Sequence, residues 1–106
     1  MARTLLNVPP TARKGEVIEL RALIAHKMDP GFLTDSQGKL VPRDIIRRFA
    51  CRYNGELVFE AELHAAIAAN PLIAFHTVAT ASGRLEFTWE GDKGFLMTES
   101  ATIQVT

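Results

Sequence analysis

The side chains best suited to chemistry in this sequence are one cysteine, three histidines and a group of arginines. A thiol enzyme needs an exposed cysteine that a neighbouring base activates. Nothing in the spacing of His26, His64 and His76 places any of them beside Cys51. Cys51 instead lies in the middle of an apolar-alternating run, where a thiol behaves as a small buried hydrophobe. The sequence therefore favours a structural cysteine over a catalytic one.

The sequence supports a metal site no better than it supports a thiol enzyme. A blue-copper site needs Cys, His and Met ligands clustered near one loop, but Cys51 is distant in sequence from His76 and Met97. His76 also lies in an apolar run and is expected in the core. His26-Lys27-Met28 supplies two ligands at most, and no zinc-ligand spacing is present. We therefore expect no catalytic residue, no cofactor and no metal.

The most distinctive polar group is basic: Arg43, Arg47, Arg48 and Arg52, with Asp44 among them. Arginine is favoured at protein interfaces because its planar guanidinium pairs with carboxylates while its stem packs on apolar groups. In a strand, Arg48 and Arg52 project from the same face, about 13 Å apart. The alternative is a charged outer face that prevents edge-to-edge aggregation.

The elements that must position these side chains are strands, because apolar and polar residues alternate with a period of two. Leu85, Phe87 and Trp89 show the alternation, and the same pattern places Phe49 inward and Ile46 outward. Asn54-Gly55 is a strong hairpin signal. The predicted strands lie near residues 4–8, 16–25, 45–53, 56–63, 72–80, 84–90 and 95–105. About seven short strands with almost no helix predict an all-β sandwich of two antiparallel sheets.

Two segments depart from this pattern. The connection from His26 to Pro42 is long. It carries one turn-forming segment, Asp29–Gly31, before the apolar pair Phe32-Leu33 and another, Asp35–Gly38, after it. Loops of this length are commonly functional or disordered, and this one either binds a partner or packs against the domain's own edge. The alanine-rich stretch His64–Asn70 is compatible with one helical turn before Pro71.

Length and charge further limit the classes of function that the chain could have. A chain of 106 residues is one domain, 1–106, with 47% hydrophobic residues to fill a core. Its net charge of zero argues against a general nucleic-acid binder. Residues 1–53 carry a balance of +5 and residues 54–106 a balance of −5, an asymmetry that can steer a partner. No apolar run is long enough to span a membrane, and we expect no secretory signal.

The sequence resembles the SoxZ family, whose members are small subunits of the SoxYZ sulfur-oxidation carrier complex. The segments that carry the resemblance are Arg3-Thr4, Gly15–Glu19, His26–Met28, Gly31-Phe32, Val41–Phe49, Tyr53–Glu56, Ala61–His64, Ile67–Pro71 and Thr98–Ile103. Together they span essentially the whole chain at the family's usual length.

The resemblance implies an immunoglobulin-like sandwich that binds SoxY and catalyses nothing itself. In that complex SoxY carries sulfur intermediates of thiosulfate oxidation on a cysteine in a glycine-rich tail. The ending Gln104-Val105-Thr106 has no such tail, so we expect the scaffold subunit, which presents the loaded arm to other Sox enzymes. The resemblance also implies a periplasmic location, reached by export together with SoxY.

The residues that touch SoxY are our inference from this sequence. We expect them in the segment from Met28 to Phe32 and in the strand that carries Arg43, Arg47, Arg48 and Arg52. An exposed apolar patch is expected where the partner binds, with homodimers of the isolated chain through it. The alternatives are a small sulfur-handling protein that uses Cys51 as its thiol, and a generic adhesion or chaperone-like sandwich.

Overall fold

Eight β-strands account for the regular structure in the computed structural model, which describes residues 3–65 and 67–106. The strands are β1 (Thr4–Asn7), β2 (Thr11–Ala12), β3 (Val17–Ile24), β4 (Ile46–Tyr53), β5 (Glu56–Glu62), β6 (Leu72–Val78), β7 (Gly83–Gly91) and β8 (Leu96–Val105). A 3-10 turn, Asp92–Gly94, joins the last two. All seven predicted strands are present to within two residues at each end. The two-residue β2 is additional, because so short a segment has no detectable period.

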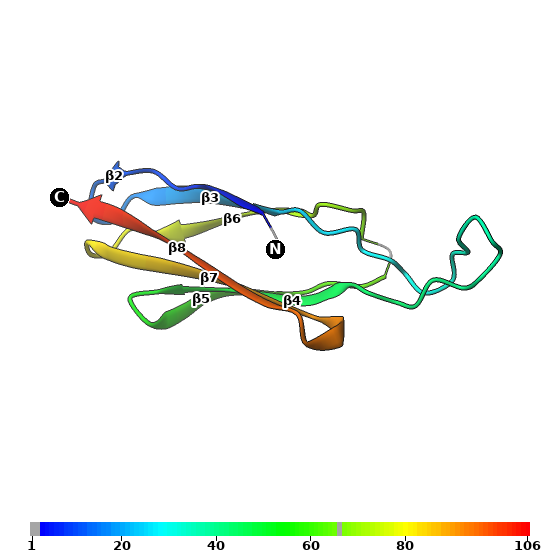
Figure 1. The fold of residues 1–106 in the computed structure, drawn as a ribbon. Coiled ribbons are helices and arrows are strands. Elements are labelled where there is room, and N and C mark those ends of the chain that lie inside the picture. The colour runs from blue at the N-terminus through cyan, green and yellow to red at the C-terminus, as the bar shows by residue number, and fades with distance from the viewer. Residues whose placement is uncertain (1–2, 66) are drawn as a thin grey trace.

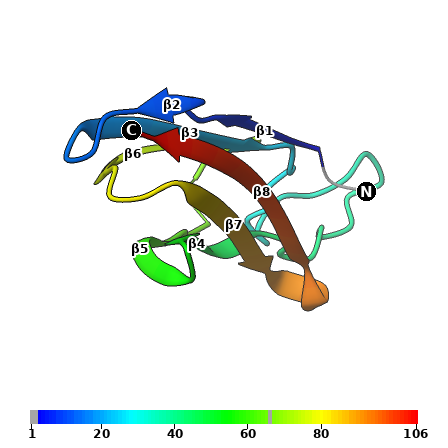
Figure 2. The ribbon, with the colours of Figure 1, turned by 90° about the vertical axis from the view of Figure 1, so that its left-hand side faces the viewer.

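The strands form two packed sheets, which confirms the immunoglobulin-like sandwich (Figures 1 and 2). One sheet has the order β1-β3-β6 and the other β2-β8-β7-β4-β5. The N-terminal segment serves both sheets: β1 pairs with β3, and β2 pairs with β8. Pro9-Pro10 lies at the switch, where residues without an N–H interrupt strand pairing. The β2–β8 pair is parallel, which corrects the expectation of two purely antiparallel sheets.

Aromatic side chains from both sheets fill the space between them. Phe49 of β4 lies at the centre, 5.3 Å from Trp89 and 5.9 Å from Phe75 between ring centroids. Phe59 of β5 stacks on Phe75 of β6 at 4.3 Å. Offset and edge-on ring pairs of this kind add about 0.5–1.5 kcal/mol each to the gain from apolar burial. This cluster fixes how the two sheets face each other.

The start of β4 departs from the predicted alternation. Ile45 and Ile46 are both buried, so the prediction that Ile46 faces outward is wrong. The pairing with β7 shifts between Ile46 and Arg48, as a β-bulge does when it inserts one extra residue. Gly91 lies opposite the bulge, and a Cβ there would come within 2.6 Å of the Ile45 carbonyl oxygen. The bulge therefore turns two successive isoleucines into the core and requires glycine on the neighbouring strand.

The connection between β5 and β6 also differs from the expected helical turn. Its described part forms a turn in which the Ile67 N–H donates to the His64 carbonyl at 3.0 Å, and Ala66 lies outside the described residues. Asn70 then joins the connection to the end of β3: its N–H donates to the His26 carbonyl, and its side-chain oxygen accepts from the His26 N–H. Within the described ranges, no helix is long and apolar enough to cross a bilayer.

The Tyr53 hydroxyl gives a direct test of this architecture, because it joins β4 to the β6–β7 turn. It donates to the Ala81 carbonyl and accepts from the N–H groups of Thr80 and Ala81, each at 3.3 Å. Tyr53→Phe leaves these backbone groups without their partner, so we expect the free energy of unfolding to fall by about 1–3 kcal/mol in urea denaturation. Thr102→Val, at an exposed position of β8, is the control and should change it by less than about 0.5 kcal/mol. Equal midpoints for the two variants would contradict the assignment.

Candidate functional site

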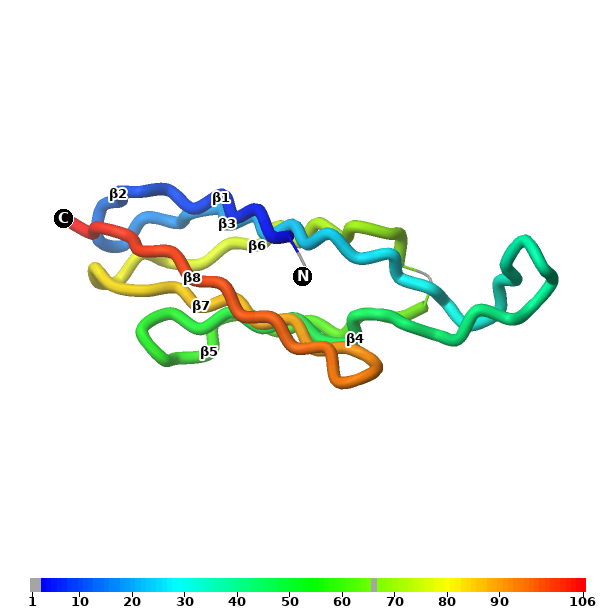
Figure 3. Tube along the Cα trace, viewed as in Figure 1, coloured from blue at the N-terminus to red at the C-terminus, as the bar shows by residue number. Residues whose placement is uncertain are grey.

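The connection between β3 and β4, residues 25–45, forms a long loop that projects beyond the ends of both sheets (Figures 1 and 3). It makes the molecule elongated, with extents of 58 × 21 × 20 Å. Residues 32–40 are all exposed, and they include Phe32 at 73% and Leu40 at 63%. The apolar side chains at the tip thus point into solvent and do not pack against the domain's own edge.

The tip of the long loop is held in one shape by its own hydrogen bonds. Thr34 and Leu40 form an isolated antiparallel bridge, and the Val41 N–H donates to the Leu33 carbonyl at 2.8 Å. The Asp35 carboxylate accepts from the Gln37 and Lys39 N–H groups at 2.8 and 3.0 Å. Gly38 closes the turn with a φ of +80°, a conformation that costs glycine little. The result is a narrow hairpin that presents its apolar side chains on an ordered backbone.

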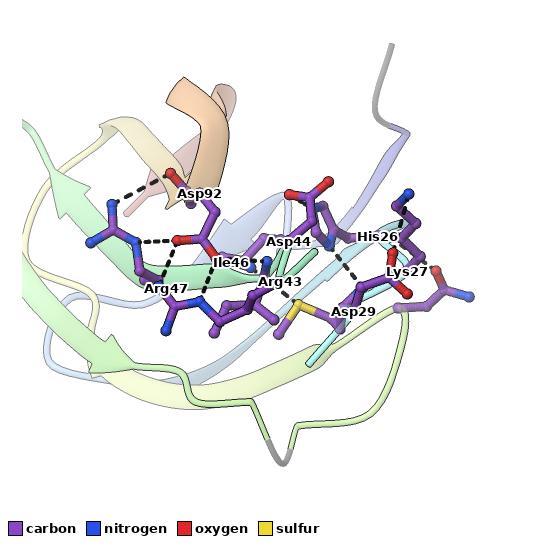
Figure 4. A network of polar contacts seen from close by, with 12 residues as sticks. His26, Lys27, Asp29, Arg43, Asp44, Ile46, Arg47 and Asp92 are labelled. Carbon is purple, nitrogen blue, oxygen red and sulfur yellow. Dashed lines mark hydrogen bonds and ion pairs between the residues drawn. The ribbon is translucent and has the colours of Figure 1, made fainter. Parts of the chain in front are cut away.

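An acidic residue from the other end of the sequence secures one side of the loop's base (Figure 4). Asp92, just after β7, accepts from Arg43 Nε and Nη2 at 2.9 and 2.8 Å and from the Ile45 N–H at 3.2 Å. Arg47 Nε lies 3.1 Å from the same carboxylate. The hydrogen bonds from Arg43 are the main reason that the pKa of Asp92 is lowered from its ordinary value. We call Asp92, Arg43 and Arg47 the arginine clasp.

The opposite side of the base is closed by backbone pairing and a buried thioether. Asp29 and Asp44 exchange N–H···O bonds at 3.0 and 2.8 Å, which join the two arms of the loop. Met28, 3% exposed, accepts a hydrogen bond on Sδ from the Ile46 N–H at 3.2 Å. The Met28 N–H donates in turn to Nδ1 of His26. The loop therefore leaves the sandwich from a fixed root (Figure 4).

The six residues predicted to bind a partner occupy four kinds of position. Phe32 is at the exposed tip, Arg43 and Arg47 are in the arginine clasp, and Met28 is buried beneath the loop, where it can affect a partner only indirectly. Arg48 and Arg52 lie on the outer face of the five-stranded sheet. Whether any of them touches a partner stays a prediction.

The arginines do not act as one cluster, because the bulge in β4 divides them. Arg48 binds Glu60 and Glu90, and the bond with Glu60 is the main reason that its pKa is raised. Arg52 reaches the Gly55 carbonyl at 3.5 Å. A surface hollow of about 360 Å³ lies between the clasp and Arg48, lined by groups of both charge signs. Asp92 was missed by sequence analysis, because its partner Arg43 lies 49 residues away in the sequence.

The cysteine and histidine considered as catalytic or metal-binding candidates do not form a reactive site. Cys51 is fully buried, and desolvation raises the pKa of its thiol to about 12. This burial argues against the alternative in which Cys51 handles sulfur. His76, expected in the core, is exposed instead on the outer face of β6. Across residues 3–65 and 67–106, no group of three or more His, Cys, Asp or Glu side chains is placed to hold a metal ion.

Comparison with known protein families gives a separate line of evidence about the chain's function. The profile of the family described as "Sulphur oxidation protein SoxZ" matches residues 6–102, nearly the whole chain. The chain belongs to the SoxZ family. This assignment confirms the resemblance seen in the sequence and gives the chain a role in sulfur oxidation, as a member of a Sox protein complex.

Solved structures similar to this SoxZ-family chain show its fold. A superoxide reductase (neelaredoxin) from Ignicoccus hospitalis superposes with a TM-score of 0.73 at 13% identity, covering 97% of this chain and 80% of that one. A putative superoxide reductase from Thermotoga maritima gives 0.66 at 14% identity, covering 97% and 85%. At these identities the likeness establishes the fold and nothing about activity. No curated protein matches the chain.

The buried thiol of this SoxZ-family chain makes a kinetic prediction. With a pKa of about 12, about one Cys51 in 10⁵ is a thiolate at pH 7, and the thiolate is the form that reacts. We expect iodoacetamide to label the native protein at least about 100-fold more slowly than the urea-unfolded protein, because access requires opening of the core. Mass spectrometry of timed samples measures both rates. Labelling of the native protein as fast as that of the unfolded protein would restore Cys51 as a candidate sulfur-handling group.

The arginine clasp predicts how the long loop responds to charge. Asp92→Asn removes the carboxylate that Arg43 and Arg47 share, so amide hydrogen exchange should accelerate in residues 25–45 while the sheets keep their protection. The pKa of Asp92 is lowered in the folded protein. Its contribution to stability is therefore complete above the ordinary pKa of an aspartate, and it is lost as the pH falls through the lower pKa of the folded state. Acidifying the native protein should therefore reproduce the variant's loop exchange. Glu86→Gln, which breaks an ion pair with Arg84 away from the loop, is the control and should leave loop exchange unchanged.

Proposed function

We propose that this SoxZ-family chain is a non-catalytic scaffold that binds SoxY to form the SoxYZ carrier complex. SoxY would carry the sulfur intermediates of thiosulfate oxidation on its own cysteine, and the complex would present them to the other Sox enzymes. The observation that carries the proposal is the apolar hairpin tip, which is exposed to solvent yet fixed on an ion-paired root. The buried Cys51 thiol supports it, because the chain's own cysteine is poorly suited to carry the cargo.

The tip has the composition of an interface anchor. Phe32, Leu33 and Leu40 leave their side chains largely in water, and burying each such side chain fully is worth about 1.5–3 kcal/mol. Because the hairpin is already ordered by its own hydrogen bonds, less conformational entropy is lost when a partner binds. A protruding, preorganised apolar hairpin is suited to enter a pocket on SoxY.

The arginine clasp extends the proposed contact surface from the hairpin tip to the base of the long loop. A specific interface needs about 1,000 Å² or more of buried area, which exceeds what a hairpin tip supplies, so the contact must continue along the loop. Arg43 and Arg47 keep about half of their side-chain surface exposed while they bind Asp92. Each guanidinium has five N–H donors, so both retain donors for a carboxylate of the partner. We expect the facing surface of SoxY to be apolar at its centre and acidic at its rim.

The location proposed for this scaffold is the periplasm, reached as a folded pair with SoxY. The proposal rests on the family assignment. The hairpin is ordered in the folded domain, which is consistent with binding of SoxY before export. Detection of this chain in the periplasmic fraction of cells that express SoxY, and its retention in the cytoplasm of cells that lack SoxY, would be the expected pattern.

Binding to SoxY tests the proposed function and the proposed surface together. We expect purified SoxY from the same host to bind this chain stoichiometrically in isothermal titration calorimetry. Phe32→Ser should weaken the affinity at least about tenfold, since about 1.4 kcal/mol corresponds to a factor of ten and aromatic anchors commonly contribute more. Leu57→Ser is the matched control, because Leu57 is also an exposed apolar residue but lies beside the β4–β5 turn.

The two failures of that experiment have different meanings. If SoxY does not bind the wild-type chain, the scaffold proposal is wrong. If SoxY binds the wild-type chain and Phe32→Ser equally well, the partner is right and the long loop is not the contact surface.

A further inference from the structure

The outer edge of β6 is a strand edge with free hydrogen-bonding groups. β6 pairs with β3 in a continuous antiparallel register. Because antiparallel pairs alternate between bonded and non-bonded positions, and Ile24 bonds to Pro71 at the start of the ladder, the odd-numbered residues of β6 bond to β3. The N–H and C=O groups of Leu72, Ala74, His76 and Val78 therefore point away from the sheet. Within the described parts of the chain, none of them has a backbone partner on that side.

The other three sheet edges carry the features that prevent unwanted pairing, whereas β6 does not. Edge strands are commonly protected by shortness, charge, proline or bulges. β1 has four residues and β2 has two. β5 has three glutamates in its seven residues. β6 runs for seven residues, Leu-Ile-Ala-Phe-His-Thr-Val, without an acidic residue, a lysine, an arginine, a proline or a register shift.

No strand of the described residues pairs with the outer edge of β6, and a hollow lies beside each of its ends. In immunoglobulin domains a further strand lies next to the one equivalent to β6 and completes its sheet, but here the order of the described elements passes from β5 directly to β6. A hollow of about 490 Å³ flanks the start of β6, lined by Leu63, Ile67 and Leu72 among others. A second, of about 380 Å³, flanks its end at Thr77 and Val78. Residues of the β5–β6 connection line the first hollow, and residues of the β4–β5 hairpin line the second.

We propose that a second copy of this chain adds its own β6 to this edge, antiparallel and centred on Phe75, to form one six-stranded sheet. This register places Leu72 opposite the second copy's Val78 and Ala74 opposite its His76. All four of these residues are even-numbered, so their backbone N–H and C=O groups point away from β3. The register therefore pairs free N–H and C=O groups of one copy with free groups of the other. The strand is thus complementary to itself in hydrogen bonding.

The side chains on the outer face are complementary in the same register. Within one copy, Leu5, Leu23 and Leu72 lie in one row across the three strands, and Leu72 is 57% exposed. Val78 and Val17 form a second pair, also exposed. Pairing at Phe75 joins these rows end to end, so that one apolar stripe crosses the new sheet on each side of the two-fold axis. Cross-strand apolar neighbours contribute about 0.2–1 kcal/mol per pair.

The charged groups agree with this arrangement. Arg21 lies beside Ala74 in its row, and Glu19 lies beside His76. The proposed register places the row of Arg21 and Ala74 in line with the second copy's His76 and Glu19, so that no acidic, lysine or arginine side chain lies directly opposite another across the new strand pair. The interface lies along the side of the sandwich, whereas the long loop projects from its end (Figure 1).

Sedimentation of the isolated chain tests the proposal. We expect the wild-type protein to form a concentration-dependent dimer in analytical ultracentrifugation. Ala74→Lys places a charge at an exposed edge position in line with the second copy's His76, and it should weaken dimerisation at least about tenfold, as lysine does on protected edges. Thr98→Lys, at an exposed position on the five-stranded sheet, is the control and should sediment like the wild-type protein.

A disulfide trap tests the register itself. In a hydrogen-bonded antiparallel pair the Cα atoms are about 5.5 Å apart, which a disulfide can span. The double variant Ala74→Cys/His76→Cys should therefore form a reducible covalent dimer, whereas Thr98→Cys should not. A wild-type chain that stays monomeric at millimolar concentration, together with no trapped dimer, would overturn the proposal. So would loss of SoxY binding in Ala74→Lys with no change in self-association, because that result assigns the β6 edge to SoxY.

Discussion

The contact on which the rest of this structure depends is the packing of Phe49 between the two sheets. Its ring meets aromatic residues from β5, β6 and β7, so it holds together strands that are far apart in the sequence. Once these rings are buried, the alternation of each strand decides which side chains face water. The surfaces available for function are therefore the outer faces, the strand edges and the loops that leave the ends of the sandwich.

The long loop is the largest exception to this packing, and its root shows how the fold accommodates it. A protruding segment gains little from burial, so it must be held by polar contacts and by its own backbone pairing. Asp92 provides the decisive contact, because one carboxylate binds Arg43, Arg47 and the Ile45 N–H together. The β-bulge beside it buries Ile45 and Ile46. Polar and apolar contacts thus meet at the point where the loop leaves the sandwich.

The distribution of exposed apolar groups suits a scaffold with two separate contact surfaces. The hairpin tip projects from one end of the molecule, and the edge of β6 runs along its side (Figure 1). The outer face of the five-stranded sheet, in contrast, carries arginines and glutamates in mutual ion pairs, which lowers its tendency to bind apolar partners. In the proposed arrangement, the loop would bind SoxY while the strand edge binds a second copy.

The sequence by itself determined the sandwich, the seven longer strands, the Asn54-Gly55 hairpin and the family, because alternation and turn formation depend on neighbouring residues and short motifs. It also indicated that Cys51 is structural. Only the tertiary structure decided that Ile46 turns inward, that Asp92 binds the arginines, and that β2 pairs in parallel with β8. It likewise decided that His76 is exposed and that β6 has a free edge. These features depend on pairing between segments that lie tens of residues apart, and a local period carries no information about which strands become neighbours.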